Sequence, residues 1–113
     1  MAESKITVDN TAVWVGNISS SNASVIVGSV SVYRIGKLIQ LVVDIQQKTA
    51  TASTLIFEDV PKPRRRLRLV LCANGGATMV LDLNTNGTIT TSAAPSSSNN
   101  GSYFGCTAMY VEA

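Results

Sequence analysis

A chain of 113 residues with 45% hydrophobic residues is long enough for one hydrophobic core and too apolar to be disordered. Its net charge of +2 does not indicate nucleic-acid binding, and no apolar run reaches the ~20 residues of a membrane-spanning helix. Serine, threonine, valine and isoleucine are abundant, and no long segment has helical spacing. We therefore expect a single all-β domain over residues 1–113, without membrane insertion.

Short strands alternate with polar segments in the first part of the chain. Strands are predicted at 6–8 and 12–15, and the polar residues 17–22 are predicted to form a loop. Residues 29–44 then carry the clearest pattern, because apolar and polar residues alternate on both sides of Gly36-Lys37. This period of two predicts two strands joined at that glycine.

The second of these two strands is apolar on both faces. Ile39, Leu41, Val43 and Ile45 define one face, which we assign to the core. Leu38 and Val42 make the opposite face apolar as well. Such a strand needs a second cover, from another sheet or from another subunit.

The middle of the chain combines a turn with a basic run. A polar connection at 46–53 and a strand at 55–57 are followed by Pro61 and Pro63, which cannot lie in a central strand. The basic run begins at once, with five of the nine cations between 62 and 68. We predict that a strand begins near Arg65 and ends near Ala73.

The last third of the chain predicts a hairpin, a loop and a closing strand. Around Asn86-Gly87, a two-residue turn would place Leu83 opposite Thr90, whereas a three-residue loop with left-handed Gly87 places Leu83 opposite Ile89. The second register pairs apolar with apolar residues, so we favour it. A flexible loop at 94–100 and a strand at 102–111 complete about eight short strands, which indicates an antiparallel β-sandwich or barrel of jelly-roll-like form.

The order of these signals resembles the C-terminal receptor-binding head domain of bacteriophage tail fibres and related minor structural tail proteins. The resemblance covers Val30 to Thr91 and rests on VSVYRIGKLIQL, VPKP and LDLNTNGTIT. Lys37 stands where asparagine is usual, the proline turn is shortened, and the arginine run lies outside the family pattern.

The resemblance implies an antiparallel β head that forms a homotrimer about the fibre axis and binds a host cell-surface saccharide. Its other partners would be tail or baseplate proteins, and its location the virion, assembled in the host cytoplasm. Such heads usually follow a shaft, so a chain of this length is expected to be an excised domain or an unusually short fibre. The competing interpretation is a structural or assembly β-module, such as a capsid accessory domain or a trimeric head of the tumour-necrosis-factor type.

Candidate ligand-binding residues fall into three groups: aromatic rings that could stack on a sugar, cations that could bind phosphate or an acidic polymer, and amides beside a polar loop. These are Trp14 and Tyr103, then Arg64, Arg66 and Arg68, then Asn99 and Asn100. Each has a plainer interpretation: core or interface packing for the rings, a solvated or protective edge for the cations, and contact with water for the amides.

Catalysis is not expected. The chain has no histidine, which removes the side chain best suited to proton transfer near neutral pH and any histidine-based metal site. Glu58 and Asp59 are adjacent and would point to opposite faces of a strand, so they cannot act as a glycosidase pair. We expect no cofactor and no nucleic-acid partner, because no aromatic residues are interleaved with the arginines. Cys72 and Cys106 could form a disulfide, but two buried thiols in a protein assembled in a reducing cytoplasm are the simpler expectation.

Overall fold

The computed structural model describes residues 13–92 and 96–113, which form an all-β fold. Its elements are β1 (Val13–Ser19), β2 (Ile26–Ile35), β3 (Leu38–Gln47), β4 (Leu55–Phe57), β5 (Leu67–Cys72), β6 (Thr78–Leu83), β7 (Ile89–Thr91), the 3-10 helix η1 (Ser97–Asn99) and β8 (Tyr103–Val111). In this part of the chain no helix has the length and apolarity needed to cross a membrane.

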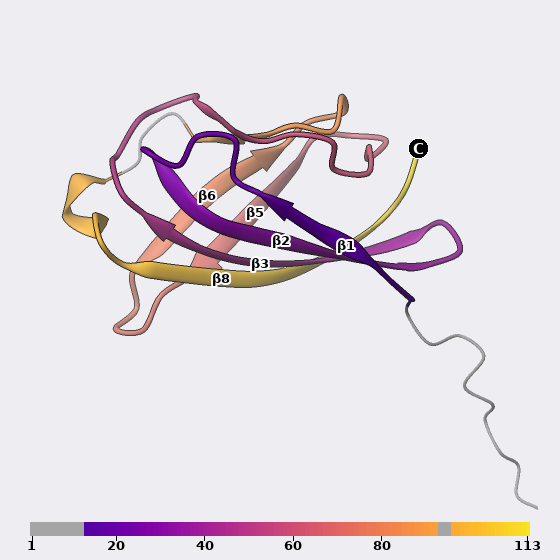
Figure 1. The fold of residues 1–113 in the computed structure, drawn as a ribbon, viewed down its shortest axis with the longest axis horizontal. Coiled ribbons are helices and arrows are strands. Elements are labelled where there is room, and N and C mark those ends of the chain that lie inside the picture. The colour runs from indigo at the N-terminus through magenta and orange to yellow at the C-terminus, as the bar shows by residue number, and fades with distance from the viewer. Residues whose placement is uncertain (1–12, 93–95) are drawn as a thin grey trace, which may run out of the picture.

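All strand pairs are antiparallel, and the strands form one sheet in the order β1-β2-β3-β8-β5-β6-β7-β4. Figure 1 shows β1, β2, β3 and β8 side by side as one layer, with β5 and β6 behind them. The loop after β1 returns to the other end of the sheet, where the Ser21 N–H donates to the Ile56 carbonyl of β4 at 2.7 Å. The sheet is therefore a nearly closed barrel, which confirms the all-β antiparallel prediction and selects the barrel over the two-sheet sandwich.

The core follows from the alternation along the strands. The four residues assigned to the inner face of β3 are all at most 1% exposed, and Val30 and Val32 of β2 lie opposite two of them. The barrel interior is filled by residues from β2 to β8, including Phe57, Leu71, Leu81, Ile89 and Phe104. The period-two pattern thus identified the buried face of the central strands.

The β6–β7 hairpin has the register that pairs apolar residues. Leu83 lies opposite Ile89, and Gly87 has a φ of +84° in the loop between them. The Gly87 carbonyl accepts a hydrogen bond from the Val60 N–H at 3.0 Å, so the loop also docks on the segment that precedes the prolines. The three-residue loop prediction is confirmed.

Three boundaries differ from the prediction. Residues 17–19 belong to β1, because their backbone pairs with β2 despite their polar composition. The strand predicted from Arg65 begins only at Leu67, so Arg64 and Arg66 lie in the connection that follows the prolines. Residues 97–99 of the predicted loop form η1, capped by the Ser96 hydroxyl. The strand predicted at 6–8 lies outside the described residues.

Both cysteines are free thiols, but the expectation that both are buried is wrong for Cys72. Cys72 is exposed at the end of β5 and pairs with Gly105, whereas the next residue of β8, Cys106, is half-buried against the core. Adjacent positions of a strand point to opposite faces, so the two side chains lie on different sides of the sheet. Burial raises the pKa of the Cys106 thiol, and the nearby Cys72 adds to the effect.

Candidate functional site

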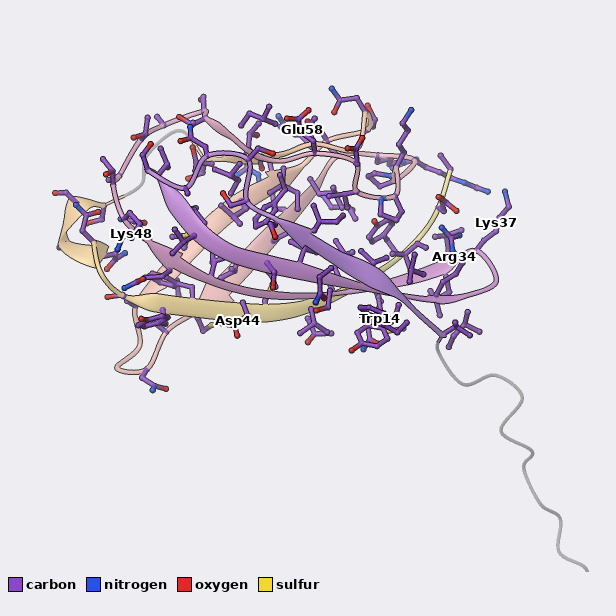
Figure 2. All side chains as sticks on the ribbon, in the orientation of Figure 1. Trp14, Arg34, Lys37, Asp44, Lys48 and Glu58 are labelled. Atoms are coloured by element: carbon purple, nitrogen blue, oxygen red, sulfur yellow. The ribbon has the colours of Figure 1, made fainter. Side chains whose placement is uncertain are left out.

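The surface of interest is the outer face of β1, β2, β3 and β8, the face turned away from the core. The ladders align residues of these strands in rows across the face. One row runs through Trp14, Tyr33, Gln40 and Met109. Trp14 and Asp44 both lie on the lower side of the ribbon in Figure 2, and Glu58 lies on the upper side. The rows show that the two ends of this outer face differ in chemistry.

At one end the face is apolar, and we call this area the apolar end. It consists of Trp14, Tyr33, Ile35, Leu38, Met109 and Val111, which occupy two neighbouring rows. Trp14, Met109 and Val111 are 57%, 56% and 48% exposed. Leu38, which the sequence marked as needing a second cover, is only half-buried. Within residues 13–92 and 96–113, this end is therefore an aromatic and aliphatic surface open to water, the kind of contiguous patch that marks interaction surfaces.

Cations border the apolar end. Lys37 is exposed in the turn between β2 and β3, and Figure 2 shows it with Arg34 at the right-hand end of the barrel. An antiparallel bridge pairs Pro63 with Glu112, which places the exposed Arg64 at the register position opposite Val111. The apolar end thus has a basic rim.

Beneath this end, polar contacts close the barrel. Arg34 donates to both carboxylate oxygens of Glu112, with an Nη2–Oε2 distance of 3.3 Å. This contact lowers the pKa of the Glu112 carboxyl and raises the pKa of the Arg34 guanidinium. The Tyr110 hydroxyl donates to the Pro61 carbonyl at 2.6 Å, and burial raises the pKa of that phenol. These groups are engaged in holding β8 to its neighbours.

At the other end, the face carries a shallow hollow of about 300 Å³, lined by both polar and apolar groups. We call it the Tyr103 hollow; it is lined by Val27, Gly28, Ser29, Asp44, Ile45, Gln46 and Tyr103. Three strands supply it through register, since Ser29 of β2 lies opposite Asp44 of β3, and Gln46 of β3 lies opposite Tyr103 of β8. Opposite Asp44 on β8 is Gly105, which has no side chain to cover the carboxylate.

The two aromatic candidates lie on the same face but not in one site. Trp14 lies in the same row as Met109 of β8. Met109 is six residues after Tyr103 on that strand, so at the usual strand rise the two rows are about 20 Å apart. Trp14 belongs to the apolar end, and Tyr103, at 68% exposed, forms the wall of the hollow.

The two asparagine candidates take part in contacts within the fold. The buried Gln47 amide donates to the Asn100 side-chain oxygen at 2.8 Å, and to the Ser96 carbonyl at 2.8 Å. Asn99 lies in a separate cleft of about 190 Å³ and donates to the Thr78 carbonyl at 3.5 Å. Both residues anchor the segment before β8 and lie outside the Tyr103 hollow.

The three arginine candidates are all exposed but are not on one strand face. Arg64 and Arg66 lie in the connection before β5, and Arg68 lies on β5 with its Nε 3.5 Å from an oxygen of Asp82. The basic connection lies at the end of β8 that carries Val111, whereas Tyr103 begins that strand. Eight residue steps separate those ends, about 27 Å along an antiparallel strand.

Sequence reasoning missed Asp44, Gln46 and Ser29. They occupy the polar positions of two strands that were predicted from the alternation of their apolar residues. Polar residues at such positions usually only face water. The available signal was the acidic Asp44 within the most apolar strand of the chain. Their grouping with Tyr103 depends on the pairing of β3 with β8, about 60 residues away in sequence, which local pattern does not indicate.

The site offers hydrogen-bond acceptors and an aromatic ring. Among residues 13–92 and 96–113, no three histidine, cysteine, aspartate or glutamate side chains gather closely enough to hold a metal ion. The sequence matches no protein-family model and no curated protein.

Proposed function

We propose that this domain is the receptor-binding head of a bacteriophage tail fibre, a non-catalytic module that forms a homotrimer and binds a host cell-surface saccharide. The observation that carries the proposal is the apolar end of the outer face, which the part of the chain described by the structure leaves uncovered. The sequence resemblance supplies the biological setting, a virion tail in which the head is joined to other tail or baseplate proteins.

Self-association follows from how the chain distributes apolar residues. Only 14% of its residues are charged, and the two rows of the apolar end contain none on the outer face apart from the rim. Trp14, Met109 and Val111 are each about half exposed. Burying them between copies would favour association by roughly 25 cal/mol for each Å² of apolar surface removed from water. Other copies of the same chain can cover the apolar end. In a cyclic trimer the apolar end of each of the three copies is covered.

The edge strand β1, which contributes Trp14 to the apolar end, supports the same proposal. β1 has seven residues without a charge or a proline, and Val13, Trp14 and Val15 are all more than half exposed. Natural β proteins usually protect such an edge with lysine, proline or a covering segment. An edge of this kind is compatible with burial in an assembly.

The test is the molar mass in solution, measured by light scattering on the eluting domain. We expect about three times 11.9 kDa for the wild type. Met109→Glu places a charge in the centre of the apolar end and should give monomers. Val70→Glu is the matched control, because Val70 on β5 is also 56% exposed but lies outside the apolar end, so it should remain trimeric. A monomeric or dimeric wild type overturns the trimer.

The receptor role needs a separate measurement. Added domain should compete with phage adsorption to host cells, and the domain should bind glycans of the host surface on an array. A trimer that neither competes nor binds any bacterial glycan would instead be the structural or assembly module that the sequence leaves as the alternative.

A further inference from the structure

The Tyr103 hollow combines an open aromatic ring with unpaired acceptors. Tyr103 is 68% exposed although it lies in a regular strand, and its ring faces solvent beside Gln46. Asp44 is exposed and makes no side-chain hydrogen bond or ion pair with residues 13–92 or 96–113. The Gln46 amide nitrogen donates to the Gly101 carbonyl at 3.1 Å, which fixes that side chain and leaves its oxygen as an acceptor.

These groups match the two sides of a pyranose ring. The C–H face of a sugar is apolar and packs on an aromatic ring, whereas its hydroxyls need partners when they leave water. An ionised carboxylate has two acceptor oxygens and can take both hydrogens of a neighbouring pair of hydroxyls, and bonds to a charged acceptor are the stronger ones. Asp44 and Gln46 supply these acceptors, and the Ser29 hydroxyl can either donate or accept.

The backbone keeps the hollow open. Gly28, with a φ of +132°, lets β2 approach β3 closely at Asp44 and Ile45, and Gly105 leaves the flank of Asp44 bare. The hollow of about 300 Å³ is at the lower end of the range for small-molecule sites. That size fits one sugar residue.

Charge narrows the class of sugar. Among the residues that the structure describes, Asp44 is the only acidic or basic one that lines the hollow, and no ion pair joins it to Lys48, which follows β3. The basic connection lies at the far end of β8, about 27 Å away by strand rise, well beyond the screening length of about 8 Å at physiological salt. An anionic sugar or a phosphate-bearing polymer would meet repulsion from Asp44 here, and Lys48, just after the end of β3, is the nearest cation along the chain.

We propose that the Tyr103 hollow is a binding site for an uncharged pyranoside, with Tyr103 stacked on the ring and Asp44 accepting from two adjacent hydroxyls. This inference rests on the proposed function as a saccharide-binding head, and it names the site and the charge class of the sugar. In this proposal the connection that carries Arg64 and Arg66 does not contact the sugar.

The experiment is a nitrogen-15 NMR titration of the intact chain with defined probes. The neutral probes are the methyl glycosides of glucose, galactose, rhamnose and N-acetylglucosamine, and the anionic probes are glucuronate and glycerol 3-phosphate. We expect at least one neutral probe to shift the amides of Ser29, Gln46 and Gly105 in a saturable manner. The anionic probes should bind there at least tenfold more weakly.

Variants then assign the roles. Tyr103→Ala and Asp44→Asn should each weaken the neutral probe about tenfold or more, whereas Tyr103→Phe keeps the ring and should retain affinity. Asp59→Asn is the matched control for the lost carboxylate, since Asp59 is exposed and its φ of +61° suits asparagine equally well. It should leave affinity unchanged.

The outcomes separate this inference from the proposed function. Shifts confined to another surface, unchanged affinity in Tyr103→Ala and Asp44→Asn, or equal binding of the anionic probes overturn the site, even if the domain still competes for adsorption. The absence of shifts with every neutral probe also overturns it. The receptor role falls only if glycan-array binding and adsorption competition are both lacking, and the trimer is tested separately by the molar mass.

Discussion

Gly28→Ala tests how the backbone forms the floor of the Tyr103 hollow. Gly28 lies opposite Ile45 in the β2–β3 ladder with a φ of +132°, which side-chain-bearing residues rarely adopt. A Cβ at this position would stand 2.3 Å from the Asp44 carbonyl oxygen and 2.7 Å from the Ile45 Cα. Both are backbone atoms of a central strand, so the collision cannot be relieved by rotating a side chain.

The expected cost has two parts. Holding alanine in a sparsely populated backbone region costs about 1–3 kcal/mol, and forcing β2 away from β3 adds a cost of about 1–3 kcal/mol, as for overpacking. The sum, about 4 kcal/mol, is a large share of the 5–15 kcal/mol typical of a small domain. For a domain of this size it corresponds to a fall in Tm of roughly 15–30 °C.

The assay is urea denaturation followed by far-UV circular dichroism, with all variants at one protein concentration because association adds to apparent stability. Gly36→Ala is the matched control: its φ is +58°, and a Cβ there would have no heavy atom within 4 Å. It should cost about 1 kcal/mol, the left-handed penalty less the entropy that alanine removes from the unfolded chain. Equal destabilisation by the two variants would refute the collision argument.

Two further predictions concern the contacts that hold β8. Tyr110→Phe removes the hydrogen bond to Pro61 and should cost about 1 kcal/mol, seen as a lower urea midpoint at neutral pH; an unchanged midpoint would contradict it. Because Arg34 lowers the pKa of Glu112 below its ordinary 4.5, the pair stabilises the fold above that pH and loses its effect as the pH falls below it. Wild type should therefore lose more stability than Glu112→Gln between pH 6 and pH 3 in urea, and parallel losses would contradict this.

The sequence was informative wherever one strand faces a core on one side only. Ile39, Leu41, Val43 and Ile45 are buried as the period of two predicts, since a register slip would move all four into water. The Leu83–Ile89 pairing was predictable for a similar reason, because only one loop length places the two apolar residues opposite each other.

Local pattern failed where pairing partners decide the structure. Asn17 and Ser19 have the composition of a loop, yet the β2 ladder gives their backbone groups partners, and the Asn17 side chain accepts a hydrogen bond from the Ser31 hydroxyl. In the arginine run, alternation with leucine predicted a strand two residues too early. Pro63 pairs with Glu112 through an isolated bridge, and the regular β5 ladder starts only at Leu67.

The apolar end and the Tyr103 hollow together determine how strongly the proposed head would attach to a cell. A shallow hollow with one exposed ring and few acceptors can bind a single sugar only weakly, because much of the sugar remains in water. If the apolar end joins three copies, each assembly carries three hollows, and binding of the second and third becomes intramolecular. Effective concentrations set by a rigid head can raise overall avidity by 10²–10⁴ without any new contact. Strong cell attachment would therefore require both the apolar end, which joins the copies, and the Tyr103 hollow, which binds the sugar. We expect Met109→Glu to weaken cell attachment far more than it weakens the affinity of a single hollow for a methyl glycoside.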